Sequence, residues 1–413
     1  MLRIHSTLIG LILVSLVCPF CMAESNLDWP NWRGPQKNGI SLETDWSCNW
    51  PTQGPPVLWK QQVGIGFSSI AVSQNRAYTM GNTGKKGTGQ FPANQDVVYC
   101  FDAQTGQELW SHSYASDLKP NGYEGGTSAT PTIAEGRVYT LSKHGMVFCL
   151  NAASGKVLWR KDLVKEFGLE LPTWGLSSSP LLIRKTIVLN AGTHGLALSQ
   201  ANGSLVWSTG KGKAGYSTPV EYQIEGLDCL ALFGLDTLAG IKAHTGELLW
   251  KIPWKAKYDE NIADPIIHKG HMFVSSFLGS RCSLFEIERN GLEERWQRKD
   301  LLNWLNSSVL WQGYAYGVDA KDKALKCLNF NTAEIQWTYP NVGLGSLMMA
   351  DGKLIVLTEK GQLLIASASS KEFSPMNKAN ILTGKCWTVP VLSQGRLYAR
   401  NAEGDLVCLE MKP

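Results

Sequence analysis

Residues 101–110 read Phe-Asp-Ala-Gln-Thr-Gly-Gln-Glu-Leu-Trp, and closely related stretches recur at 150–159 and 241–250. Each stretch joins the end of one apolar strand to a glycine turn and to a second strand that carries the tryptophan. The glycine precedes the tryptophan by four residues, where a tight hairpin needs a positive φ that other residues adopt only at a cost. The stretch therefore predicts the hairpin of a repeated antiparallel sheet.

The tryptophan at the end of this stretch occurs in seven copies at intervals of 41 to 51 residues, which is the repeat length of β-propeller blades. One large aromatic side chain per sheet predicts a residue that packs between neighbouring sheets. An eighth copy at 363–373 places a phenylalanine in the same position, and the copy before it has Ala333 in place of glycine, which predicts a different turn. The predicted docking residues are Trp59, Trp110, Trp159, Trp207, Trp250, Trp296, Trp337 and Phe373.

The number of copies predicts an all-β fold, an eight-bladed β-propeller of four-stranded antiparallel blades. The last unit, 386–410, has no closing tryptophan strand, whereas residues 56–64 form such a strand with no three strands before it. We therefore predict that the N-terminal strand closes the ring, because closure removes exposed sheet edges. One helical turn is expected, at 162–168.

The first 23 residues have a short polar start, an apolar stretch and a small-residue cleavage site, which predict a secretory signal peptide. We expect an N-terminal extension at 24–55 and the propeller at 56–413. The protein is accordingly predicted to be exported, to the periplasm or beyond, and to act as a monomer. No further apolar segment is long enough for a transmembrane span.

The net charge limits the expected partners, and the positions of the cysteines limit the expected disulfides. The formal net charge is only +4 and no basic run occurs, which argues against nucleic acid. Four cysteines, Cys100, Cys149, Cys327 and Cys408, share one repeat position. Blades are too far apart there for a disulfide, so we expect small buried fillers. Cys48 and Cys386 both belong near the closure, where export would allow a bond.

The repeated pattern Asp-x-x-Thr-Gly-x-x-x-Trp resembles the quinoprotein (PQQ-type) propeller repeat over essentially the whole chain after the signal. The opening Trp-Arg-Gly-Pro at 32–35 and the closing stretch at 387–398 are similar to secreted PQQ-like propeller proteins of planctomycete-type bacteria. A more distant resemblance is to the outer-membrane-assembly propeller BamB. The resemblance implies the fold, whereas one scaffold of this kind hosts enzymes and adaptors alike.

The resemblance implies how a quinoprotein dehydrogenase would bind its cofactors: PQQ lies beneath adjacent cysteines, and oxygen ligands hold Ca²⁺. The chain has neither a Cys-Cys pair nor a haem motif of the type Cys-x-x-Cys-His after the signal. Asp259, Glu260, Asn261 and Asp264 are candidate calcium ligands, although a solvated loop is the favoured interpretation. We therefore predict no catalytic residue and no cofactor, with PQQ and calcium as the alternative.

The start of each blade predicts a binding surface at the centre of the ring. Small polar side chains hold equivalent positions there, at Ser69, Thr130, Ser179, Thr218, Asp264, Ser308 and Ser346. Aromatic residues lie just before such positions at Phe67, Tyr216 and Trp387, and Trp174 lies in a connector. A polar funnel edged by aromatic rings suits extended peptides or sugars. The alternative is that small hydroxyls simply pack best where eight strands converge.

These observations favour a secreted, noncatalytic propeller that binds a protein or a cell-envelope component through its inter-blade connectors. Binding groups usually lie on long connectors of this kind, because a rigid ring holds their ends in place. One alternative is a PQQ- and calcium-dependent dehydrogenase acting on an alcohol or sugar. A third hypothesis is a carbohydrate-binding propeller with a glycan as its ligand.

Overall fold

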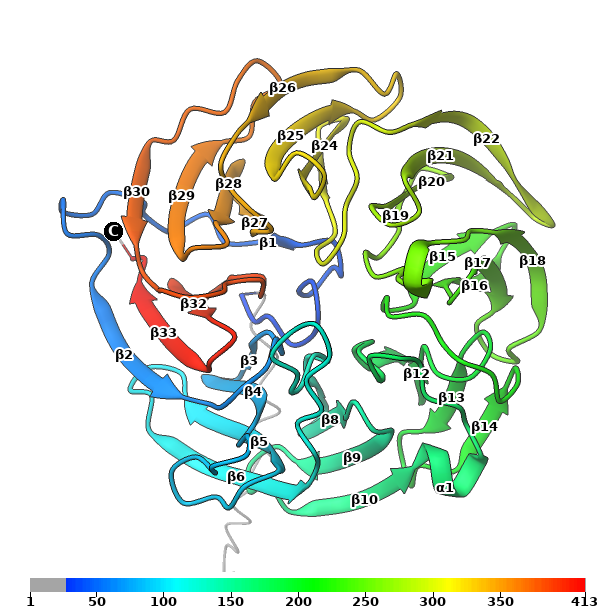
Figure 1. Cartoon of the computed structure of the whole chain (residues 1–413), viewed down its shortest axis with the longest axis horizontal. Coiled ribbons are helices and arrows are strands. Elements are labelled where there is room, and N and C mark those ends of the chain that lie inside the picture. The colour runs from blue at the N-terminus through cyan, green and yellow to red at the C-terminus, as the bar shows by residue number, and fades with distance from the viewer. Residues whose placement is uncertain (1–26, 413) are drawn as a thin grey trace, which may run out of the picture.

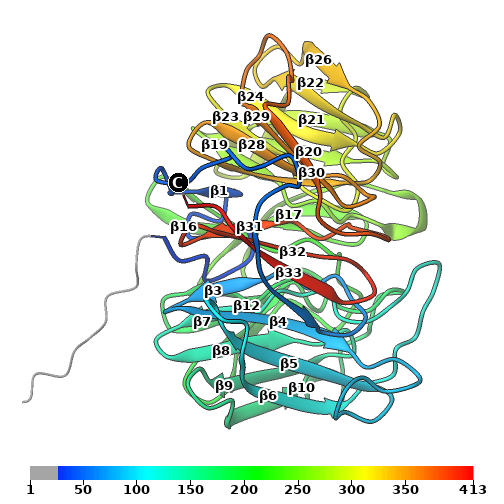
Figure 2. The same cartoon turned by 90° about the vertical axis from the view of Figure 1, so that its left-hand side faces the viewer.

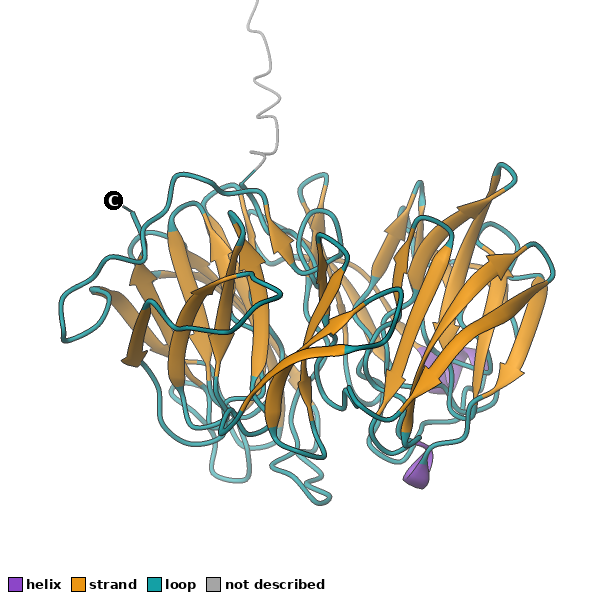
Figure 3. Cartoon of the chain, turned by 90° about the horizontal axis from the view of Figure 1, so that it is seen from above, coloured by secondary structure: helices purple, strands orange, loops and turns teal. Residues whose placement is uncertain are grey.

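The computed structural model describes residues 27–412, so the predicted signal peptide lies outside the described residues. Eight sheets surround a central axis, and each contains four antiparallel strands (Figure 1). The predicted eight-bladed propeller is confirmed. Within this range the helices are one α-helical turn, α1 (Leu163–Phe167), and one 3₁₀ turn, η1 (Lys257–Asp259) (Figure 3). Neither is long and apolar enough to cross a membrane.

The first four blades follow the chain without interruption. Blade 1 contains β3 (Ala71–Ser73), β4 (Arg76–Asn82), β5 (Gln95–Asp102) and β6 (Glu108–Ala115). Blade 2 contains β7 (Thr132–Ala134), β8 (Arg137–Leu141), β9 (Met146–Asn151) and β10 (Val157–Asp162). Blade 3 contains β11 (Leu181–Ile183), β12 (Thr186–Leu189), β13 (Leu196–Ser199) and β14 (Leu205–Ser208). Blade 4 contains β15 (Val220–Ile224), β16 (Leu227–Phe233), β17 (Thr237–Lys242) and β18 (Leu248–Pro253).

The other four blades complete the circle. Blade 5 contains β19 (Ile266–His268), β20 (His271–Ser276), β21 (Arg281–Glu288) and β22 (Gly291–Arg298). Blade 6 contains β23 (Val309–Trp311), β24 (Tyr314–Asp319), β25 (Ala324–Asn329) and β26 (Ile335–Tyr339). Blade 7 contains β27 (Ser346–Ala350), β28 (Lys353–Leu357), β29 (Gln362–Ser367) and β30 (Asn377–Asn380), with β1 (Ile40–Ser41) added in parallel to β27. Blade 8 contains β31 (Val391–Ser393), β32 (Arg396–Arg400), β33 (Asp405–Glu410) and β2 (Val57–Gln62).

Strand β2 closes the ring as predicted. It pairs antiparallel with β33, and Trp59 lies opposite Cys408 in the register. The first strand of the propeller, in blue, therefore lies beside the last, in red (Figure 1). Closure gives the sheet of β31 to β33 its fourth strand, so that blade 8 is built from both ends of the chain.

The hairpin between the third and fourth strands explains the repeated sequence. In blade 1 the Asp102 carboxylate accepts hydrogen bonds from the backbone N–H groups of Gln104 and Thr105, and Gly106 has a φ of 73°. The prediction of a different turn at Ala333 is wrong. Ala333 adopts a φ of 63°, and its N–H donates to the Asn329 carbonyl at 2.9 Å, as the N–H of Gly106 does to that of Asp102.

The tryptophans dock each blade against the next. The Trp59 indole N–H donates to the Ala103 carbonyl of blade 1 at 3.2 Å, and a Cβ atom at Gly106 would lie 2.6 Å from the Trp59 ring. The turn glycine is thus required for close approach as well as for its φ. Indoles that donate to a carbonyl of the following blade are those of Trp59, Trp110, Trp159, Trp207, Trp296 and Trp337.

Two of the eight predicted docking residues behave differently. Trp250 is buried between blades 4 and 5, but its indole N–H donates to the Tyr222 hydroxyl of its own blade. Phe373 is not on the outermost strand of blade 7. It lies in the loop before β30 and packs against Trp337, with ring centroids 5.7 Å apart. Pro375, which has no N–H to donate to the ladder, separates Phe373 from β30, and hydrogen bonding to β29 begins with the Met376 N–H, which donates to the Ile365 carbonyl at 2.8 Å.

The cysteines of the shared repeat position are buried fillers, as predicted. Each lies between a tyrosine on the second strand and a tryptophan on the fourth, for example Cys100 between Tyr78 and Trp110. All eight cysteines of the described chain are free thiols. Cys48 and Cys386 pack in the same core cluster without a bond between them.

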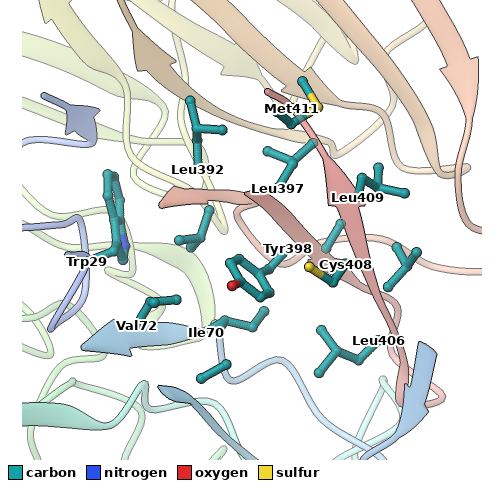
Figure 4. Packing of buried hydrophobic residues seen from close by; sticks show 14 of the residues in the cluster. Trp29, Ile70, Val72, Leu392, Leu397, Tyr398, Leu406, Cys408, Leu409 and Met411 are labelled. Carbon is teal, nitrogen blue, oxygen red and sulfur yellow. The ribbon is translucent and has the colours of Figure 1, made fainter. Parts of the chain in front are cut away.

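The N-terminal extension, residues 27–56, covers the face of the ring formed by the hairpins between the first and second strands, which we call the turn face. Trp29 exchanges two backbone hydrogen bonds of 2.8 Å with Val72 of blade 1. Figure 4 shows Trp29 near Val72 and Leu392, where blades 1 and 8 meet. The extension then runs from β1 to the outer rim, where β2 begins (Figure 2). It thereby joins the two sides of the closure.

Candidate functional site

The opposite face carries the connectors from the last strand of one blade to the first strand of the next, and we call it the connector face. Here the central channel widens into a cavity of about 470 Å³, which we call the cup. This volume is that of an ordinary ligand site. Eight aromatic residues line the cup: Trp32, Phe67, Tyr123, Trp174, Tyr216, Tyr258, Trp304 and Trp387.

The floor of the cup comes from the N-terminal extension. Trp32 lines the cup and also a second cavity of about 480 Å³ on the turn face, as Thr218 and Asp264 do. The Trp32 indole N–H donates to Asp264 Oδ2 at 2.6 Å. The neighbouring Arg33 donates to the Ser308 carbonyl at 2.8 Å, and Asp264 acts on it electrostatically. A segment far away in sequence is therefore fixed at the centre of the ring, between the first strands of blades 5 and 6.

The four tryptophans of the cup have their N–H groups engaged within the protein. The acceptor of Trp174 is the Asn121 carbonyl at 3.0 Å, and that of Trp387 is Glu359 Oε1 at 2.9 Å. Trp32 and Trp304 donate to carboxylates that themselves line the cup. Because these donors are used, the indoles offer a ligand their ring surfaces rather than hydrogen bonds.

Two carboxylates give the cup its charge. Glu260 accepts the Trp304 indole N–H at 2.7 Å, and Asp264 accepts those of Trp32 and of the Thr218 backbone. Burial raises the pKa of Asp264, and Arg33 opposes this shift. Burial also raises the pKa of Glu260, opposed only by the Trp304 hydrogen bond. Within the described range, no lysine or arginine lines the cup. Its interior is therefore aromatic and acidic.

The buried charge of Glu260 should cost stability. A carboxyl group whose pKa is higher in the folded than in the unfolded chain weakens folding once the pH rises above the folded value. We expect Glu260→Gln, which keeps an acceptor for the Trp304 N–H, to raise the midpoint of thermal unfolding at pH 7. The gain should vanish in acid below the ordinary pKa of 4.5, where the wild-type carboxyl is protonated in both states.

The exposed carboxylate Glu170, on the connector that also carries Trp174, provides the control. Glu170→Gln should leave the midpoint unchanged at both pH values. If the wild-type protein had a higher midpoint of thermal unfolding than Glu260→Gln at neutral pH, the charge of Glu260 would not destabilise the fold.

The structure brings seven of the eleven predicted binding residues into the cup, and four lie outside it. Those in the cup are Phe67, Trp174, Ser179, Tyr216, Thr218, Asp264 and Trp387. Those outside are Ser69, Thr130, Ser308 and Ser346. The predicted aromatic mouth therefore forms, whereas the predicted polar funnel does not extend along the channel.

The small polar residues form a belt of hydrogen bonds between blades instead. The Ser69 backbone N–H donates to Thr130 Oγ1, and the Thr130 N–H donates to Ser179 Oγ, at 3.1 and 3.0 Å. The pattern continues from Ser179 to Thr218 and from Thr218 to Asp264. These oxygens hold the first strands of neighbouring blades together, as the alternative of packing at the centre of the ring implies, while Ser179, Thr218 and Asp264 also line the cup.

Two predicted hydroxyls have other partners. In blade 6 the belt acceptor is Ser307, which receives the Asp264 N–H at 2.8 Å, whereas Ser308 donates to Asn303 Oδ1. The Ser346 hydroxyl donates to the Thr388 carbonyl at 2.9 Å. Both side chains are buried and serve the packing at the centre of the ring.

Sequence reasoning missed Trp32, Tyr123, Tyr258 and Trp304 as cup residues. Tyr123 and Tyr258 lie in connectors of unusual length, and an aromatic side chain in such a loop is a usable signal. Trp304 lies in the shorter connector before blade 6. Trp32 carries no signal in sequence, because its contact with Asp264 joins positions separated by 232 residues.

The residues of the cup do not fit PQQ and calcium. The Asn261 side-chain amide donates to the carbonyls of Gly234, Leu235 and Trp254, and Asp264 is bound as described above. No three acidic, histidine or cysteine side chains within residues 27–412 converge as metal ligands. A quinone tricarboxylate would also meet two carboxylates and no cation on the lining. We therefore derive no redox step from this site.

Comparison with known proteins gives a consistent fold. Outer membrane protein assembly factor BamB of Yersinia pestis is 21% identical over 370 residues, which are 85% of this chain and 88% of that protein. The crystal structure of BamB from Moraxella catarrhalis has a TM-score of 0.61 at 14% identity and covers 86% of this chain and 100% of its own.

An enzyme shares the same architecture. Quinohemoprotein alcohol dehydrogenase ADHIIG from Pseudomonas putida HK5 has a TM-score of 0.67 at 11% identity, with coverage of 94% of this chain and 80% of its own. At such identities the likeness concerns the fold alone. The protein family described as outer membrane protein assembly factor BamB matches residues 94–339. Since this match covers more than half of the 413 residues, the chain belongs to the BamB family of β-propellers.

Proposed function

We propose that this protein is an exported, noncatalytic propeller that binds a polypeptide of the cell envelope through the cup and the surrounding connectors. The observation that carries the proposal is the concentration of eight aromatic rings at the connector face. Aromatic side chains in a preformed concave site supply a large contact area at little cost in conformational entropy. The ring holds them rigidly, because docked blades and the belt fix the ends of the connectors.

The relatives support this class of function. The matched family and the Yersinia pestis protein are both named as outer membrane protein assembly factors, which describes work on other polypeptides at an envelope. An exported location for this chain agrees with the predicted signal peptide at 1–23. The protein would then meet its partner outside the cytoplasm.

The dehydrogenase alternative rests on the shared fold of the quinohemoprotein enzyme. The acidic lining of the cup argues against it, since an anionic cofactor would be repelled there. Incubation of the purified protein with PQQ and calcium distinguishes the two functions. A bound quinone spectrum together with dye reduction would favour the dehydrogenase.

A glycan is the second candidate ligand, because the Asn121 amide and the Asn306 Oδ1 atom lie among the aromatic rings of the cup. Sugars combine a ring face that stacks with hydroxyls that need polar partners. Binding on a glycan array that Trp387→Ala removes would support this function over polypeptide binding.

Site-specific photo-cross-linking tests the proposal in cells. Tyr258 lies at the rim of the cup and is 61% exposed, so a benzoylphenylalanine in its place should reach a bound partner. We expect ultraviolet light to produce one discrete cross-linked polypeptide, because a defined cup selects its partner. Mass spectrometry of the isolated product then identifies it.

The matched control is Val206 on β14, which is 47% exposed at the outer rim of blade 3. Benzoylphenylalanine at Val206 should give no such product. Equal cross-linking at both positions, or none at Tyr258, would contradict the proposal.

A further inference from the structure

One half of the cup carries a negative charge that the chain does not balance. The Glu260 side chain lines the cup, is 9% exposed and makes its hydrogen bond with the Trp304 indole N–H. No lysine, arginine or histidine of the described chain forms an ion pair with it. Buried carboxylates are ordinarily paired with a cation, because an isolated charge is costly to desolvate.

The aromatic rings around Glu260 are also suited to a cation. Trp174 and Tyr216 meet edge to face, with centroids 6.0 Å apart, and Trp304 holds the carboxylate. Burial, together with the nearby carboxylates of Glu260 and Asp259, raises the pKa of Tyr216, so its ring remains a neutral phenol. The faces of neutral aromatic rings attract cations.

In the other half of the cup, two aromatic rings each have a lysine ammonium group of the same chain over the ring. The Lys385 ammonium lies 4.2 Å from the centroid of Trp387, and that of Lys143 lies 5.1 Å from the centroid of Tyr123. Both lysines also have polar partners, in Glu124 and in the carbonyl of Lys119. At the rim of the Glu260 half, the Lys257 ammonium lies 4.8 Å from the centroid of the exposed Tyr258. Of the described residues, no cation occupies the corresponding position over Trp174, Tyr216 or Trp304.

We propose that the Glu260 half of the cup receives an arginine or lysine side chain of the partner polypeptide, with Glu260 as the counter-charge and Trp174, Tyr216 and Trp304 as the aromatic walls. This inference rests on the proposed function and specifies the chemistry of the partner. The cup volume of about 470 Å³ exceeds that of one side chain, which leaves room for the adjoining peptide backbone. The Asn121 side-chain amide, also on the lining, can bind that backbone, and Asn306 can accept from it through Oδ1, because the Asn306 N–H groups donate to the carbonyls of Gly345 and Trp387.

Calorimetric titration of the purified, full-length exported protein tests this inference. The probes are a capped glycine–arginine–glycine tripeptide and its citrulline counterpart, which has nearly the same shape without the charge. The arginine peptide should bind about tenfold more tightly, because only the charged form gains from a desolvated carboxylate and ring faces. Equal affinities would overturn the inference, and this comparison needs no variant.

Two variants locate the effect. Glu260→Gln should abolish the preference for arginine over citrulline, whereas Glu170→Gln should preserve it, since Glu170 is exposed on the connector surface. An arginine preference that persists in Glu260→Gln would overturn the assignment of the counter-charge.

A third probe separates a peptide side chain from a free organic cation. Tetramethylammonium that binds as tightly as the arginine peptide would assign the cup to small cations and overturn the polypeptide assignment. The proposed function can fail independently, because cross-linking at Tyr258 does not depend on the charge of the partner. Cross-linking without an arginine preference refutes this inference alone, whereas a preference without any cross-link refutes the proposed function.

Discussion

Replacing Trp59 by alanine should lower the free energy of unfolding by about 3–5 kcal/mol, the usual cost of truncating a large core residue. Trp59 lies on the strand that closes the ring, is 7% exposed and contacts Tyr398 of its own blade and the Gly106 turn of blade 1. Its loss leaves a cavity at the junction between the two ends of the chain and removes the hydrogen bond to Ala103.

Leu58 on the same strand is the control, because it is 37% exposed. Leu58→Ala should change the free energy of unfolding by less than about 0.5 kcal/mol, as surface substitutions usually do. Urea unfolding followed by tryptophan fluorescence measures both variants. If Trp59→Ala and Leu58→Ala were equally mild, β2 would not be an integral part of the ring.

Arg400→Met should cost about 4 kcal/mol or more, because it removes several hydrogen bonds from a site closed to water. Arg400 is fully buried between blades 8 and 1. Its guanidinium donates to the carbonyls of Met80 and Gly64 at 2.7 and 2.8 Å, and also to that of Ser68. Burial lowers the pKa of Arg400 to about 10, which still leaves the group charged at neutral pH.

The matched control for this substitution is Arg76→Met on β4. Arg76 is half-buried and donates to the Ala153 carbonyl at 3.2 Å, so its replacement should cost about 1 kcal/mol. Unfolding free energies from urea titration compare the two variants. If Arg400→Met lowered the free energy of unfolding no more than Arg76→Met, water or neighbouring groups would be replacing the hydrogen bonds of the guanidinium. The contact between blades 8 and 1 would then be looser than those hydrogen bonds indicate.

Most of the fold was predictable because each blade repeats the same local rules. The glycine turn and the tryptophan four residues later mark the hairpin, and both features are local in sequence. The prediction failed at Phe373, which lies before Pro375 and outside the pairing of β30, and at Ala333, which adopts the positive φ of the turn without being glycine. At Ala333 the turn keeps the form of the other copies despite the missing glycine, so the repeat pattern outweighs the cost of one residue.

The candidate site was predictable only in part. Phe67, Tyr216 and Trp387 were found because they precede the first strand of a blade, which the repeat locates. The belt was missed because the acceptor of each backbone N–H belongs to the next blade, 39 to 61 residues away. The floor was missed for the same reason, since nothing in the local sequence of Trp32 indicates Asp264 as its partner.

We propose that the cup on the connector face is where the protein meets its partner. Hydrogen–deuterium exchange with the polypeptide identified by cross-linking tests it most directly. Binding should slow exchange in the connectors at 117–126, 172–178 and 256–262, and leave the turn face at 73–76 and 134–137 unchanged. Protection confined to the turn face, with the connectors exchanging as in the free protein, would contradict the claim.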